Sequence, residues 1–375
     1  MKLLFKGRMA ALVVVIILLA GVTTVFASEN AVKHALADLY ALMAQNRSTA
    51  QLDALEIKVL ENAKGDADRE AAKIFNTGVY EQGFDNAVTR DVAPVEAQSM
   101  IERQKRVQAA EPLQREADLY KAVQNLLLAR AENDLQTRLL ALSREEASIA
   151  KTRFDAGVIS ASDLKDAETA VSSAELNLEK LALKLQAAEL AVNRQAGTGL
   201  DTVLEATEKD GITLLDTLFA DPDGTDGWVA VAQQRDAGTF EKSETLRVLD
   251  LKLKLVVNYM PETHSRVIKM RRDREDARLA LVDANAGVEV SVRNLLNDRL
   301  TAAESLALAK LDLEQAQRRR SQAQTRFEAG LLSRADLIAR DRDVENAQYA
   351  LLAATATLNG KEADLRVLIG KDLVP

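Results

Sequence analysis

The chain has 375 residues and a net charge of −8, and only 4% of its residues are aromatic. It has no Cys, which excludes disulfides and a lipid-modified N-terminal Cys, and its acidic balance makes nucleic acid a poor partner. Gly and Pro are scarce, as is typical of long helices rather than of a mixed sheet. We therefore expect an all-α protein.

Residues 1–27 have the pattern of an export signal. Three basic residues precede an apolar run that ends at Phe26, and small residues flank a cleavage point after Ala27. The run is close to the length of a membrane-spanning helix, so an uncleaved anchor is the alternative. Without the three basic residues, 46 Lys and Arg face 57 Asp and Glu, a net charge of −11.

The first half of the exported chain has a helical pattern with two interruptions. The pattern is helical from Ala31 to about Phe75, with a break at residues 46–49, where Ser48 or Thr49 could cap the second segment. Residues 76–94 hold Gly, Asn and Pro among scattered apolar residues and are too irregular for a strand pair. A long helix resumes near Val95 and continues to a turn near residues 155–163.

The residues of this turn account for the end of one helix and for the start of the next. Gly157 can adopt the left-handed conformation that ends a helix. Ser160 stands where an N-cap belongs, and Asp163 has the spacing of a capping box. Ile159 and Leu164 have the spacing of a hydrophobic staple. The pattern predicts a tight helical hairpin.

The same turn returns 173 residues later, where residues 325–337 repeat the pattern of residues 152–164. Gly330, Leu332, Ser333 and Asp336 occupy the equivalent places. A constant offset indicates two copies of one supersecondary unit. The sequence therefore predicts two tandem, long, antiparallel helical hairpins.

The helix after each turn carries a coiled-coil seam, with apolar residues three and four apart from Leu164 and from Leu337 onward. A second apolar stripe, formed by Leu176, Leu183 and Leu190, lies on another side of the first of these helices. That helix can therefore contact a neighbour on each of two sides.

The chain divides as follows: a signal peptide at 1–27, a first repeat at 28–197 with its tip near 155–163, an irregular linker at 198–240, and a second repeat at 241–375 with its tip near 328–336. Within the linker, residues 221–227 resemble a calcium loop, but Asp226 and Ala232 stand where an EF-hand needs Gly and Glu. We expect no metal site.

Nothing in the sequence favours an enzyme. His34 and His264 are the only histidines and lie far apart, and no phosphate loop or nucleophile elbow is present. We expect no catalytic residues and no cofactor.

The motif Arg-Phe-x-x-Gly-x-x-Ser-x-x-Asp-Leu, found twice between heptad helices and behind an export signal, resembles that of the TolC-like outer membrane efflux protein family. The resemblance covers roughly residues 100–197 and 273–370. It implies a homotrimer with a twelve-helix periplasmic tube, whose tips dock with a membrane fusion (periplasmic adaptor) protein and an inner-membrane transporter. The location would be the cell envelope, in the periplasm or at the outer membrane, or the extracytoplasmic face of the membrane if the signal stays uncleaved.

The sequence departs from the family in one respect. Family members insert barrel strands before each long helix, and such strands need ~10 alternating residues each. Residues 76–94 and 258–266 are the places for them, and neither shows that pattern. We expect the barrel strands to be absent or vestigial.

The resemblance assigns roles to the turn residues. The tips would dock the partner, and the residues concerned are Gly157, Val158, Ile159, Ser160, Gly330, Leu331, Leu332 and Ser333. Asp163 and Asp336 would line the entrance of the pore, although helix capping is the favoured explanation and the two roles can coexist. The predicted function is a conduit of an efflux or type I secretion assembly. The alternative is an extracytoplasmic coiled-coil scaffold or adaptor without transport activity.

Overall fold

The structure is a computed structural model that describes residues 32–34, 36–200, 202, 204–206 and 224–371. The predicted signal peptide lies outside the described residues, as does most of the linker between 201 and 223. The described elements, in chain order, are β1 (Val32–His34), α2 (Leu36–Asn46), α3 (Ala50–Ala72), α4 (Tyr80–Asp91), α5 (Ala93–Asp155), α6 (Ala161–Ala196), β2 (Leu204–Ala206), α7 (Gly224–Arg235), α8 (Ala237–Val256), α9 (Ser265–Glu328) and α10 (Arg334–Ile369).

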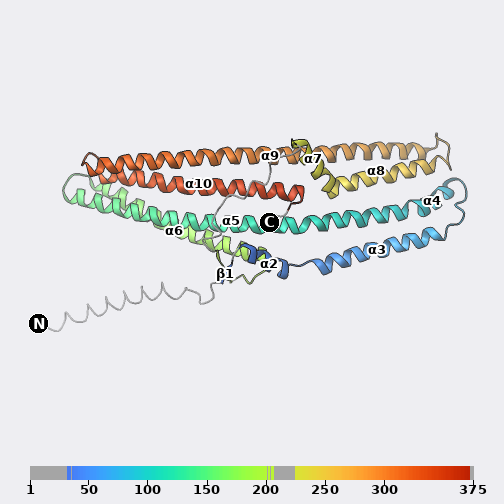
Figure 1. Cartoon of the computed structure of the whole chain (residues 1–375), viewed down its shortest axis with the longest axis horizontal. Helices are drawn as coiled ribbons and strands as arrows, with labels where there is room; N and C mark the ends of the chain where they lie inside the picture. Colours follow the sequence, from blue (N-terminus) through green and yellow to red (C-terminus); the bar gives the residue numbers. More distant parts are fainter. Residues whose placement is uncertain (1–31, 35, 201, 203, 207–223, 372–375) are drawn as a thin grey trace, which may run out of the picture.

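The protein is a long bundle built on two helices that run its whole length (Figure 1). Helix α5 has 63 residues and α9 has 64. At a rise of 1.5 Å per residue, each is roughly 95 Å long. The predicted all-α class and the two tandem hairpins, α5–α6 and α9–α10, are confirmed.

Four helices lie abreast in each half of the bundle. Near the hairpin turns the order is α6, α5, α10 and α9, and toward the other end it is α3, α5, α8 and α9 (Figure 1). Helices α6 and α3 therefore form one edge of the layer, and α9 forms the other edge along its whole length.

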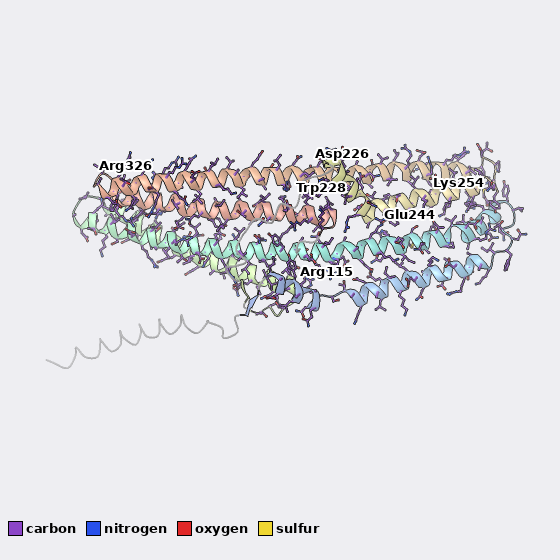
Figure 2. The ribbon with its side chains drawn as sticks, in the orientation of Figure 1. Arg115, Asp226, Trp228, Glu244, Lys254 and Arg326 are labelled. Atoms are coloured by element: carbon purple, nitrogen blue, oxygen red, sulfur yellow. The ribbon has the colours of Figure 1, made fainter. Side chains whose placement is uncertain are left out.

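The bundle is held by three apolar clusters rather than by one core. At mid-length, Leu39 and Met43 of α2 pack against Leu119 and Leu126 of α5. Trp228 of α7 packs nearby against α9 and the end of α10 (Figure 2). A third cluster, Phe84, Val256, Met260 and Val267, holds α4 against the turn between α8 and α9. Each cluster lies where helices begin or end.

Three local predictions were wrong. Residues 32–34 were expected to be helical, but they form a short parallel strand pair with residues 204–206. The irregular stretch at 76–94 contains helix α4. Residues 224–235 and 237–240, which were assigned to the irregular linker, belong to α7 and α8.

Residues 76–94 hold a short loop followed by helix α4, and residues 257–264 form a tight connection from α8 to α9. Among the described helices, none combines the length and the apolar character that crossing a membrane requires.

Candidate functional site: the hairpin tips

Both hairpin turns lie at the same end of the bundle, as Figure 1 shows for the α5–α6 and α9–α10 connections. Figure 2 labels Arg326 of α9 beside them, with Lys254 of α8 toward the opposite end. The structure therefore brings together the two sets of turn residues that are 173 positions apart in the sequence.

Each first helix ends in the way that its Gly predicts. Gly157 has φ 72° and Gly330 has φ 73°, both in the left-handed region. The Val158 N–H donates to the Arg153 carbonyl at 2.8 Å, and the Gly157 N–H donates to the Phe154 carbonyl at 2.8 Å. These two bonds are those of a Schellman motif. The second turn repeats them at 2.8 and 2.9 Å.

Each second helix begins at the predicted serine. The Ser160 N–H donates to Asp163 Oδ2 at 2.9 Å, and the Asp163 N–H donates to Ser160 Oγ at 3.2 Å, which completes a capping box. The hydrogen bonds that the Asp163 carboxylate accepts from the Ser160 N–H and from the Ser160 hydroxyl lower the pKa of that carboxyl below its ordinary value. In the second turn, Ser333 Oγ accepts from the Asp336 N–H at 3.2 Å. The Asp163 side chain therefore has the capping role, whereas the Asp336 carboxylate accepts from the Ser333 hydroxyl at 2.6 Å. The entrance role of both carboxylates stays a prediction.

The apolar residues of the turns divide into two kinds. Val158 and Leu331 are 63% and 78% exposed. Ile159 and Leu332 are half-buried, as the predicted staple requires. The tips therefore present two exposed apolar side chains that are not part of the staple of their own hairpin.

Ion pairs between α5 and α10 connect the two hairpins near their tips. Arg334, the first residue of α10, donates two hydrogen bonds to the Glu145 carboxylate of α5, at 2.6 and 2.9 Å. This bidentate contact lowers the pKa of Glu145 and raises that of Arg334. Farther along, Arg342 donates to Glu146 at 2.7 Å. These residues could not be predicted from the sequence, because a pair on two different helices leaves no periodic signal.

The edges of the layer carry exposed apolar stripes. Leu176 and Leu183 of α6 are 67% and 68% exposed, whereas Leu181, on the seam of the same helix, is 7% exposed. The exposed stripe of α9, on the other edge, includes Leu308 and Leu311. The predicted second stripe of α6 therefore has no neighbour within one described chain.

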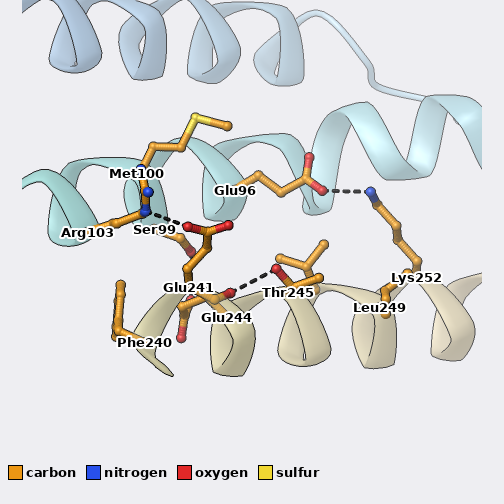
Figure 3. A pocket seen from close by; sticks show the side chains of 11 residues that line it. Glu96, Ser99, Met100, Arg103, Phe240, Glu241, Glu244, Thr245, Leu249 and Lys252 are labelled. Carbon is orange, nitrogen blue, oxygen red and sulfur yellow. Dashed lines mark hydrogen bonds and ion pairs between the residues drawn. The ribbon is translucent and has the colours of Figure 1, made fainter. Parts of the chain in front are cut away.

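A groove of about 530 Å³ lies between α5 and α8 (Figure 3). Charges cross it in pairs: Glu96 with Lys252 at 2.6 Å, and Arg103 with Glu241 at 2.7 Å. Four of the charged residues drawn there thus pair with each other across a seam between the two repeats, and the fifth, Glu244, pairs with Arg247 of its own helix. Over the described part of the chain, no group of three or more His, Asp or Glu residues could hold a metal ion.

Comparison with known proteins gives a family model that matches part of the chain and solved structures of similar fold. Residues 227–371 match the family model described as outer membrane efflux protein. The structure is similar to that of the outer membrane protein VceC from Vibrio cholerae, with a TM-score of 0.61, 14% identity and coverage of 90% of this chain and 96% of VceC. The fold is TolC-like. No curated protein sequence matches it.

Two further channels share the TolC-like fold. The outer-membrane channel OprN has a TM-score of 0.65 and 14% identity, with 91% of each chain covered. The MtrE channel of Neisseria gonorrhoeae has a TM-score of 0.62 and 13% identity, with coverage of 90% of this chain and 89% of MtrE. The matched family is one of transport channels rather than of enzymes.

Proposed function

We propose that copies of this TolC-like chain close into a helical tube that acts as the conduit of an efflux or type I secretion assembly. The observation that carries the proposal is the pair of unpartnered apolar edges. One edge consists of α6 with Leu176 and Leu183, and the other of α9 with Leu308 and Leu311. Two different edges on one chain make a head-to-tail contact, and such contacts close into a ring when the rotation permits.

The number of copies follows from the resemblance. Four helices lie abreast in each half of one chain. Three copies would give the twelve-helix tube of TolC-like proteins, so a homotrimer is the expected assembly. Leu52, Leu55 and Val59 extend the first apolar edge along α3, where they are 58–65% exposed. The edges are therefore apolar in both halves of the proposed tube.

The tips are the proposed docking site for a membrane fusion protein, which would link the tube to an inner-membrane transporter. Val158 and Leu331 offer exposed apolar surface on a rigid turn, since the Schellman and capping bonds fix the backbone behind them. A protein partner could bury both side chains without reshaping the turn. Neither catalytic activity nor a cofactor is part of this function.

Asp163 and Asp336 are proposed to favour cations at the entrance of the tube. Both carboxylates are exposed at the end of the bundle. In a trimer they would form a ring of six negative charges, and a charged ring biases the ions that enter a pore. Helix capping uses these carboxylates locally and leaves their charge in place.

One experiment separates the conduit from the alternative, a scaffold without transport activity. We expect the chain to have the mass of a closed oligomer, with and without detergent, and to conduct ions when reconstituted. Val158→Asp with Leu331→Asp should lower cross-linking to a co-expressed membrane fusion protein and leave the oligomer intact. A monomer or dimer without conductance would favour the scaffold, and undiminished cross-linking would exclude docking at the tips.

A further inference from the structure

The end of the bundle opposite the hairpin tips carries an exposed apolar loop between α3 and α4. We call residues 73–80 the distal loop. Phe75 is 94% exposed, Val79 is 82% exposed and Tyr80 is 55% exposed. We propose that this distal loop inserts into the interface of a zwitterionic lipid bilayer, a contact that goes beyond the proposed conduit and that a single chain could make.

The distal loop is held in a fixed shape by contacts with α4 and with the connection between α8 and α9. The Asn86 side chain donates to the Thr77 carbonyl at 3.0 Å, and the Thr77 and Tyr259 hydroxyls lie 2.9 Å apart. A Cβ on Gly83 would lie 2.7 Å from the Gly78 carbonyl oxygen, so the loop packs directly on α4. Phe75 and Val79 are therefore exposed although the backbone that carries them is fixed.

Backbone conformation also indicates a functional loop. Tyr80 has φ 57° and is the one non-glycine residue with positive φ in the part of the chain that the structure describes. A bulky residue in this region costs free energy, and such outliers cluster at functional sites. The Tyr80 ring lies edge-on to the His264 ring at 5.8 Å.

The polar groups of the loop suit a medium that offers few hydrogen bonds. The Gly78 N–H donates to the Asn76 side chain at 3.0 Å, and the Val79 carbonyl accepts from the Gly83 N–H at 3.1 Å. When backbone groups are hydrogen-bonded within the loop, moving the loop out of water costs less free energy, because fewer hydrogen bonds to water are lost. Tyr is itself a residue that prefers the boundary between lipid and water.

Charge and shape favour lipid over a protein partner. The basic residues around the loop are paired with acidic neighbours of the same chain: Lys73 with Glu70, Arg90 with Asp91, Arg266 with Asp85, and Arg271 with Glu262. Such an end selects neither an anionic nor a cationic surface, which fits a zwitterionic headgroup layer. Three projecting side chains also offer far less area than the roughly 800 Å² per partner of a specific protein interface.

The test is flotation of the full chain with vesicles of phosphatidylcholine and phosphatidylethanolamine. Phe75→Ser with Val79→Ser should lower the partition coefficient at least tenfold, since burial of one large apolar side chain changes an equilibrium by about that factor. The matched control is Val158→Ser with Leu331→Ser, which removes two exposed apolar side chains from the opposite end and should leave flotation unchanged.

A second measurement locates the contact. A Phe75→Trp variant should show a blue shift and quenching by brominated lipid, whereas a Val158→Trp variant should show neither. Equal flotation of the wild type and the loop variant would overturn the inference, as would flotation only with anionic lipid. A cross-link from position 75 to a second copy or to another protein, without lipid contact, would also overturn it. Oligomeric mass is measured separately, so failure of the tube and failure of the lipid contact are distinguishable.

Discussion

The proposed tube depends on the second apolar stripe of α6, and two substitutions test it directly. We expect Leu176→Gln with Leu183→Gln to leave the single chain folded and to prevent the oligomer from closing. Gln has nearly the helix propensity of Leu, so α6 itself should persist. The two leucines face away from α5, because they are 67% and 68% exposed while Leu181 on the seam is 7% exposed.

The expected loss follows from the exposed area. Complete burial of a Leu side chain is worth about 1.5–3 kcal/mol, so two-thirds of that is about 1–2 kcal/mol for each residue. Two leucines then contribute about 2–4 kcal/mol at each contact between copies. At about 1.4 kcal/mol per factor of ten, the association constant should fall by roughly 30- to 700-fold.

Light scattering after size-exclusion chromatography, over a series of protein concentrations, measures this loss, and circular dichroism checks the fold. Leu181→Ala is the matched control on the same helix. It should cost about 2–5 kcal/mol of stability, because it leaves a cavity in the α5–α6 seam. If the double variant assembled at the same concentration as the wild type, α6 would not be a contact edge and the ring argument would fail.

Four further substitutions test the ends of the bundle. Gly157→Ala should cost about 1–2 kcal/mol in chemical denaturation through its left-handed backbone alone, because an added Cβ would meet nothing within 4 Å. Ser160→Ala should cost about 1 kcal/mol as a lost N-cap. The lowered pKa of Asp163 means that its stabilisation is present above the ordinary carboxyl pKa and is lost as the pH falls through the folded value. Asp163→Asn should therefore remove this acid-dependent step from an acid titration of the tip followed by hydrogen exchange. Phe84→Ala, at a site that is 1% exposed, should cost about 3–5 kcal/mol and speed hydrogen exchange in α4 but not at the tips.

The turns could be predicted because their chemistry is local. Each turn uses bonds between near neighbours in the sequence. A Gly ends the first helix, a Ser follows three residues later, and an Asp follows three residues after the Ser. Such patterns leave a fixed spacing in the sequence. The left-handed glycines and the N-cap serines of both turns could therefore be predicted from the sequence.

Helix α4 was missed because Gly83 has a packing role that the sequence does not reveal. Gly normally signals a turn, and here it stands inside a helix. Its missing side chain lets the distal loop approach α4, where a Cβ would lie 2.7 Å from the Gly78 carbonyl oxygen. Helix α7 was missed for a related reason, since Trp228 is buried against Val292 and Ile369, residues that are distant in the sequence.

The seam between the two repeats could not be predicted at all, and it determines how the chain holds together. Glu96 and Lys252 are 156 residues apart, and Lys121 and Asp364 are 243 apart, yet each pair joins α5 to a helix of the second repeat. Complementary charges on two helices have no common period, so no spacing reveals them. Each partly exposed pair contributes only about 0–1 kcal/mol. The apolar cluster around α2, which includes Ala363 of α10, must therefore supply much of the attachment, and the charged pairs favour one register of the second repeat on the first.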